Sequence, residues 1–310
     1  MLNPLVGTTG LHPWDSTVTH DLLRSLNPLY MRMSVNYGRW QNEIQFYDQQ
    51  YALNSMYQII LCLETVPLDQ IETFVPMILD RYKVWGVTPV NEDENAARTA
   101  QRILEFHRVV PEARLIGPDL QNNYSPVYVD ELVRLGAIGC LDIIAMHDYF
   151  AVPSTPESLV WYRPDEIVTY WGLPNLPARI AWMKSYVLRL RKKFTDGPKV
   201  MITEYGTYIN SVEDSVRAAQ ISKATDVPFM FCVPNEPAGL PGSILYAQAL
   251  YSNNNTEARW APPMEAYLVE INTPKVVVPP PVFIPPPVVV SPRRIKLSWL
   301  KKFWRFWSFW

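Results

Sequence analysis

The chain has 310 residues, 48% of them hydrophobic, and this is enough for one large α/β domain with a buried core. The net charge is −2, but the last 18 residues (293–310) contain six basic and no acidic side chains, which leaves the rest of the chain at −8. An acidic body argues against a nucleic-acid groove, and three widely separated cysteines supply neither a disulfide framework nor a zinc site.

The chain begins with MLNPLVGTTG, which lacks a basic segment followed by an apolar run, so we expect no secretory signal and synthesis in the cytoplasm. Short runs rich in β-branched and aromatic residues then recur along the chain. Within each run most positions are apolar, without the polar alternation of a half-exposed strand. This pattern indicates strands buried on both sides. The predicted strands cover residues 5–10, 29–35, 58–64, 83–90, 113–119, 142–149, 199–206 and 227–233.

Segments with helical spacing of apolar residues separate these strands. Alternation of eight strands with about eight helices predicts a parallel (β/α)₈ TIM barrel. A doubly wound open sheet is the runner-up, and it loses support because no Gly-rich phosphate loop follows an early strand. The clearest helical patterns cover residues 15–26, 66–82, 95–110, 176–194 and 242–252.

Polar side chains lie at or just after the ends of most predicted strands. In a parallel barrel these ends open into one shared bowl, where barrel enzymes carry their chemistry. We therefore take as candidate site residues Arg32, Asn91, Glu92, His147, Tyr149, Glu204 and Glu236, while Glu64 and Asp119 end two further strands without a predicted role.

Four short motifs around these candidate residues resemble motifs of the clan A glycoside hydrolases, which are (β/α)₈-barrel enzymes. ITEYG around Glu204 is similar to the context of their nucleophile at the end of strand seven. Asn91-Glu92 matches, in residue type and strand position, the Asn and acid/base Glu that follow strand four. Arg32 and His147-Asp148-Tyr149 resemble the strand-two Arg and the strand-six His-x-Tyr of the clan.

The resemblance covers roughly residues 4–252 and implies a retaining glycoside hydrolase that cleaves a β-linked glycan by double displacement. It implies that Glu204 is the nucleophile, that Glu92 is the acid/base, and that Arg32 favours the ionised nucleophile. It further implies that His147 and Tyr149 orient Glu204, and that Asn91 contacts the sugar hydroxyl beside the reacting carbon. The expected partner is a poly- or oligosaccharide, and we expect no cofactor and no metal.

Other interpretations of the same residues remain open. Glu92 also fits an acid favoured at a helix N-terminus, and Glu204 a simple ion-pair partner. Asp93 replaces the Pro that usually follows the acid, and the last predicted strand lacks the Trp that often floors the sugar subsite. The alternative function is therefore a catalytically inactive glycan-binding or structural barrel, such as a phage or envelope attachment protein.

A literal Asn-Glu-Pro motif, typical of an acid/base, surrounds Glu236. It follows the last predicted strand, after Glu204, whereas the clan order places the acid before the nucleophile. Because Asn and Pro are common turn residues, turn chemistry explains the motif. We keep Glu236 as a candidate substrate contact.

The chain divides into a barrel (1–272), a Pro-rich linker (273–292) and a C-terminal tail (293–310). Two Pro triplets predict an extended linker that reaches on the order of 60 Å. On a helix, the tail has one cationic stripe and a broad Trp- and Phe-rich remainder. This pattern predicts an amphipathic helix at an anionic membrane surface, giving peripheral membrane or virion association, with packing on a partner protein or on the barrel as the alternative.

Overall fold

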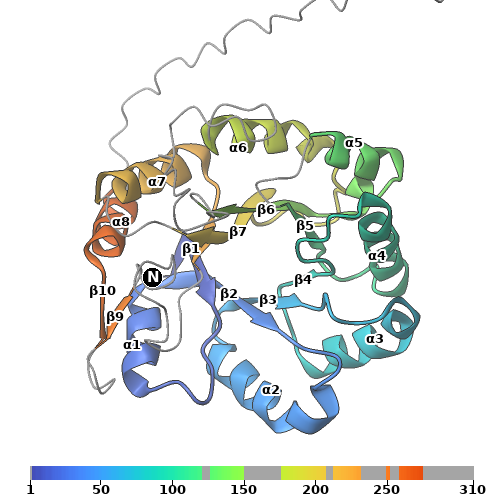
Figure 1. The fold of residues 1–310 in the computed structure, drawn as a ribbon, viewed down its shortest axis with the longest axis horizontal. Coiled ribbons are helices and arrows are strands. Elements are labelled where there is room, and N and C mark those ends of the chain that lie inside the picture. The colour runs from blue at the N-terminus through green and yellow to red at the C-terminus, as the bar shows by residue number, and fades with distance from the viewer. Residues whose placement is uncertain are drawn as a thin grey trace, which may run out of the picture. The chain divides into compact units, whose positions relative to one another are not determined.

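The structure, a computed structural model, describes residues 2–120, 126–149, 176–206, 212–231, 249–251 and 258–274. Eight parallel strands form one sheet in the order β4-β3-β2-β1-β8-β7-β6-β5. A parallel bridge between Val87 and Leu115 joins the two edge strands and closes the sheet. Helices surround the strands on the outside (Figure 1). The predicted (β/α)₈ barrel is confirmed, and the closure excludes the open doubly wound sheet.

The elements alternate along the described chain as the sequence predicts. The barrel strands are β1 (Asn3–Thr9), β2 (Pro28–Ser34), β3 (Gln58–Cys62), β4 (Gly86–Thr88), β5 (Ile116–Leu120), β6 (Ile143–Tyr149), β7 (Val200–Gly206) and β8 (Phe229–Phe231). The helices are α1 (Thr17–Ser25), α2 (Trp40–Asn54), α3 (Ile71–Arg81), α4 (Ala96–Val109), α5 (Pro126–Arg134), α6 (Leu176–Ser185), α7 (Val212–Thr225) and α8 (Pro262–Asn272).

One predicted helix is wrong. Within residues 242–252 the described part is a strand, β9 (Ala249–Tyr251), which pairs antiparallel with β10 (Ala258–Trp260). A three-residue strand has too little length for its periodicity to distinguish it from a helix, so only the pairing partner reveals it. The pair is a small addition outside the barrel, where β10 contacts α1 and α8 (Figure 1).

Two hydrophobic layers hold the barrel together. The larger layer lies between the strands and the helices, and the smaller one fills the barrel interior. An interior filled by side chains is a packed core and not a pore. The interior residues are Tyr30, Ile60, Ile116, Ile143, Ala145, Met201 and Met230, one or two from each contributing strand.

The interior changes from apolar to polar toward the carboxyl ends of the strands. Because side chains alternate with a period of two, the next interior position after Tyr30 is Arg32, and the one after Ala145 is His147. The apolar plug therefore ends directly beneath the polar residues, which keeps them partly dry and fixed in position.

The described part of the chain contains no helix that is long and apolar enough to span a membrane. Helix α8 ends at Asn272, where the predicted barrel domain ends. Residues 275–310, with nearly all of the predicted linker and the whole predicted tail, lie outside the described residues, so these two segments and their boundaries remain predictions.

Candidate active site

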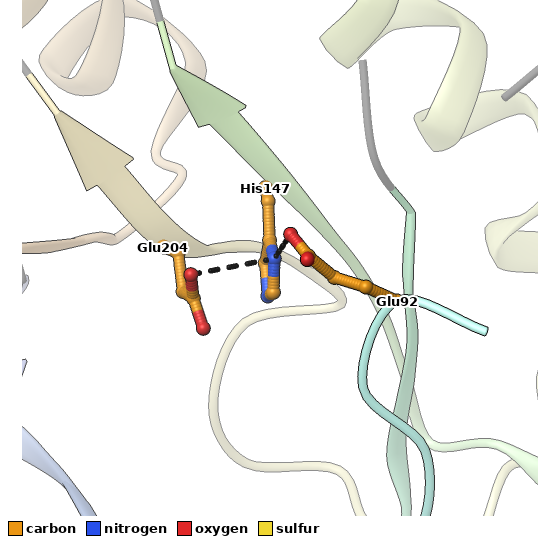
Figure 2. A group of neighbouring side chains, drawn as sticks. All are labelled: Glu92, His147 and Glu204. Atoms are coloured by element: carbon orange, nitrogen blue, oxygen red, sulfur yellow. Dashed lines mark hydrogen bonds and ion pairs between the residues drawn. The ribbon is translucent and has the colours of Figure 1, made fainter. Parts of the chain in front are cut away.

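Five of the predicted site residues meet at the carboxyl end of the barrel. Arg32 comes from β2, Asn91 and Glu92 from the segment after β4, His147 from β6 and Glu204 from β7. Figure 2 shows His147 between Glu92 and Glu204, with both carboxyl groups directed toward its ring. One carboxylate oxygen of each glutamate and one ring nitrogen of His147 all lie within 4.8 Å of one another.

His147 links the two glutamates. Its Nδ1 lies 2.6 Å from Oε1 of Glu92 and 3.5 Å from Oε2 of Glu204 (Figure 2). The imidazole is 1% exposed, whereas the side chains of Glu92 and Glu204 are 30% and 15% exposed. The site therefore has a buried base beneath two carboxyl groups that solvent or a ligand can reach.

Arg32 provides the positive charge of the site. Its Nη1 donates to Oε1 of Glu204, and its Nη2 donates to Oδ1 of Asn91 at 2.7 Å. The guanidinium side chain is only 12% exposed, so water screens this ion pair less than a surface pair. One side chain thus fixes the Glu204 carboxylate and the Asn91 amide relative to each other.

Carboxylate and imidazole groups this close together are also donor types found in metal sites. Here they contact Arg32 and one another, and the arginine already balances carboxylate charge. The expectation of a site without metal or cofactor remains a prediction.

Arg102 of α4 ties the segment that carries Glu92 to the segment that follows β3. This buried guanidinium donates to three backbone carbonyl oxygens, those of Pro89 at 2.9 Å, Val66 at 2.5 Å and Leu63 at 2.9 Å. Burial lowers the pKa of Arg102, although the carboxylates of Glu64 and Asp93 oppose this. Glu92 itself adopts φ of 52°, a left-handed conformation that a loop must hold in place for a residue with a side chain.

Asp93, which departs from the clan pattern, is a brace of the same loop. Its carboxylate accepts two hydrogen bonds from Arg98, at 2.5 and 2.6 Å, and one from the backbone N–H of Asn95. Tyr128 donates its hydroxyl to the Asp93 carbonyl at 2.6 Å. Burial raises the pKa of Asp93, but the hydrogen bonds from Arg98 and Asn95 outweigh it, so the pKa lies below its usual value.

We expect Arg102→Met to lower the free energy of unfolding by about 3 kcal/mol, because the carbonyl of Pro89, which precedes the Glu92 loop, and two carbonyls of the segment after β3 lose a charged donor. Arg108→Met is the matched control: it removes an arginine of the same helix that is 54% exposed and pairs with Glu72 and Glu105, and we expect a much smaller loss. Urea denaturation followed by circular dichroism measures both. Equal losses would show that Arg102 does not hold the loop.

A third carboxyl group, that of Asp119 on β5, joins the site from beneath. Its side chain is fully buried, accepts a hydrogen bond from Thr203 Oγ1 at 2.5 Å, and lies 3.5 Å from Nη2 of Arg32. Burial raises the pKa of Asp119, although the charges of His147 and Arg32 and the Thr203 hydrogen bond act in the opposite direction. The only sequence signal is a lone acid at the end of an apolar strand.

Irregularities in two strands direct these acids inward. In β7, Met146 of β6 pairs with Ile202 but His147 pairs with Glu204, so Thr203 is an extra residue. In β5, Gly117 pairs with Ile144 and Leu120 with Met146, so one residue near Asp119 is extra. A bulge of this kind re-aims the side chains that follow it. Regular alternation would have placed Glu204 on the face opposite Met201.

Two predicted site residues are not placed. Of Tyr149 the structure describes only the backbone, at the end of β6, and Glu236 lies outside the described residues. Residues 150–175, which follow β6, and residues 232–248, which follow β8, also lie outside the described residues. The roles assigned to Tyr149 and Glu236 remain predictions.

No protein-family model matches the sequence, and no curated protein sequence matches it either. Solved structures do match in fold. A GH5-4 broad-specificity endoglucanase from Clostridium cellulovorans aligns with a TM-score of 0.54 and 11% identity, covering 87% of this chain and 94% of that one. A GH5-4 endoglucanase from Ruminococcus champanellensis with bound cellotriose aligns with a TM-score of 0.53 and 13% identity, over 83% and 86%.

A third match is a GH5 xyloglucan-specific endo-β-1,4-glucanase from a metagenomic library, in complex with cellotriose. Its TM-score is 0.52 at 14% identity, over 82% of this chain and 88% of that one. At these identities the likeness concerns the fold. The chain is therefore a (β/α)₈ barrel built like these glycoside hydrolases, and its function has to be argued from its own residues.

Proposed function

We propose that the chain is a retaining glycoside hydrolase that cleaves a β-linked glycan, with Glu204 as nucleophile and Glu92 as acid/base. The observation that supports this most is the approach of the two carboxyl groups, with one oxygen of each within 4.8 Å of the other. Retaining glycosidases hold the pair about 5–5.5 Å apart, whereas inverting enzymes need about 6.5–9.5 Å to admit a water molecule. The short separation favours double displacement.

The first chemical step forms a covalent intermediate. Glu204, held by Arg32, attacks the anomeric carbon while the glycosidic C–O bond breaks, and Glu92 donates its proton to the leaving oxygen. In the second step Glu92 takes a proton from water, the water oxygen attacks the anomeric carbon, and the ester bond to Glu204 breaks. Two inversions return the original configuration, and Glu92 regains its proton for the next cycle.

The contacts of the site suit these roles. Arg32 stabilises the carboxylate of Glu204 before attack and when it leaves again. Asn91 presents an amide, fixed by the same guanidinium, beside the reacting carbon. The contact of His147 with Glu92 puts the acid/base within reach of a group that can share its proton. Each role falls to a residue with a defined partner.

The substrate class follows from the fold neighbours together with the site. Two of the matching enzymes hold cellotriose, and all three are named as endoglucanases or endo-β-1,4-glucanases. We therefore propose a β-1,4-linked oligo- or polysaccharide of glucose or a similar pyranose as substrate. Carboxyl groups that remain 15% and 30% exposed leave the reacting atoms open to such a chain.

The test is hydrolysis of a panel of cello-, xylo- and xyloglucan oligosaccharides and 4-nitrophenyl β-glycosides. We expect new reducing ends from at least one substrate, and NMR should show the product first with the β-configuration. An α-configured first product would contradict double displacement. Binding of an oligosaccharide by calorimetry without cleavage of any substrate would support the inactive glycan-binding barrel instead.

We further propose that residues 293–310 attach the barrel to an anionic membrane surface, because the six basic residues lie among Trp and Phe side chains. The full chain should float with vesicles of phosphatidylcholine and phosphatidylglycerol, and less with phosphatidylcholine alone. A chain ending at residue 292 should remain in the dense fraction. Equal partitioning of both chains would rule out membrane attachment through the tail and leave a partner protein as its target.

A further inference from the structure

Asp119 occupies a position that the proposed reaction does not yet use. It faces Arg32 of β2, His147 of β6 and Glu204 of β7, and Thr203 donates to its Oδ1. Cys62 of β3 is a further titratable neighbour among the described residues, and burial raises the pKa of its thiol to about 12, so it stays neutral. The fully buried carboxyl group of Asp119 thus lies close to Arg32 and His147. These two side chains in turn contact the proposed catalytic glutamates.

The position of Asp119 relative to His147 distinguishes the two ring nitrogens. Oδ1 of Asp119 lies 3.9 Å from Nε2, whereas Oε1 of Glu92 lies 2.6 Å from Nδ1. The first distance is too long for a hydrogen bond, but a charge this close acts strongly in a buried site. A negative charge facing Nε2 favours the tautomer with the proton on Nε2.

The tautomer of His147 decides how the proton between its Nδ1 and Oε1 of Glu92 is held. A neutral imidazole carries one N–H, and its other nitrogen can only accept. With one proton on Nε2, the lone pair of Nδ1 faces Oε1 of Glu92 at 2.6 Å, and this short contact then requires a second proton that Nδ1 and the carboxyl group share. A proton held on this pair is the supply that an acid catalyst needs before it donates to a leaving group.

We propose that Asp119 is a positioning residue that selects the Nε2–H tautomer of His147 and thereby keeps the proton of the short contact on the Glu92–His147 pair. The catalytic meaning of this proton rests on the proposed function, but the tautomer is a property of the protein without substrate. Burial raises the pKa of Asp119, so its carboxylate loses charge at a higher pH than an ordinary aspartate. Selection is therefore present above that raised pKa and is lost as the pH falls through it.

The decisive experiment is ¹⁵N NMR of the histidine rings in the full-length protein at neutral pH. The chain has four histidines, so omission of one signal in His147→Gln assigns the resonances of His147. We expect the wild type to carry its proton on Nε2. Asp119→Asn keeps the shape but removes the charge, and the tautomer ratio should shift toward Nδ1–H by about tenfold.

Thr203→Val is the matched control, measured well above the raised pKa of Asp119: it removes the hydrogen bond that lowers this pKa, but at such a pH it leaves the charge facing Nε2. This variant should retain the Nε2–H tautomer, which separates an electrostatic effect from general disturbance of the strand ends. An Nδ1–H tautomer in the wild type would overturn the proposal even if Asp119→Asn failed to fold. An unchanged ratio in folded Asp119→Asn would overturn it as well.

A kinetic measurement adds the link to catalysis once a substrate is found. Asp119→Asn should lower kcat with little change in KM, move the basic limb of the pH profile to lower pH, and affect 4-nitrophenyl glycosides less than natural oligosaccharides. If Asp119 had a purely structural role, its replacement would lower the rates on both classes of substrate equally. If no glycan is cleaved, the proposed function fails, and the NMR result still decides the role of Asp119.

Discussion

Glu204→Gln is expected to lower kcat/KM for glycoside hydrolysis by about 10⁴-fold or more, since loss of a covalent nucleophile leaves only binding and the remaining polar groups. Gln keeps the shape of the side chain and an oxygen that can accept from Arg32 Nη1, so the fold should survive. Initial rates on the most reactive substrate of the panel measure the loss.

Glu105→Gln serves as the control for this variant. Glu105 lies on α4 and pairs with Arg108 at the helix surface, away from the barrel mouth, so its replacement should leave the rate unchanged. A 2-deoxy-2-fluoro glycoside should add one sugar mass to the wild-type peptide that contains Glu204, and none to Glu204→Gln. Full activity of Glu204→Gln, or labelling of another carboxylate, would refute the assignment of the nucleophile.

Glu92→Gln should reduce hydrolysis of natural oligosaccharides by about 10²- to 10⁴-fold, the usual contribution of general acid catalysis. The rate of the first chemical step on 4-nitrophenyl glycosides should fall far less, because 4-nitrophenolate leaves without a proton. This dependence on the leaving group distinguishes loss of an acid from loss of a nucleophile. Rates measured on glycosides with leaving groups of increasing pKa give the test.

Glu94→Gln is the matched control for the acid/base. It removes an exposed carboxylate two residues farther along the same loop and should leave both classes of substrate unaffected. For a small variant such as Glu92→Ala, added azide should restore turnover of the activated substrates and give a β-glycosyl azide. An equal loss on all leaving groups would mean that Glu92 supports the loop and is not the acid.

The two glutamates are coupled through shared neighbours. Arg32 holds Glu204 and Asn91, and His147 contacts Glu92 and Glu204. Effects of replacing these residues should therefore be non-additive, since removal of one leaves its partner without its normal contact. This coupling makes isosteric changes, which preserve shape, the most informative variants.

Most of the architecture was accessible from the order of residues. Strands buried on both faces are apolar throughout, and the helices between them have apolar residues at helical spacing, so eight alternations predicted the closed barrel. Polar residues at strand ends then predicted Arg32, Asn91, Glu92, His147 and Glu204 as one group. These five residues lie together because parallel strands bring all their carboxyl ends to one face.

Features that depend on contacts between distant segments could not be predicted from the sequence. β9 lies in a run whose apolar residues have helical spacing, so the sequence predicted a helix where the structure has a strand paired with β10. Arg102 gave no sign that its guanidinium binds three carbonyl groups, because those groups belong to segments up to 39 residues away. Asp119 was noticed only as a strand end, since its partners lie on β2, β6 and β7.

The sequence by itself determined the barrel, through hydrophobic periodicity, and which acids stand at the strand ends, because both are local properties of the chain. Only the tertiary structure decided which way those acids point. An extra residue in β5 and another in β7 shift the pairing by one position, and such a shift moves every following side chain to the other face of the sheet. That shift is a relation between neighbouring strands, and no single strand records it.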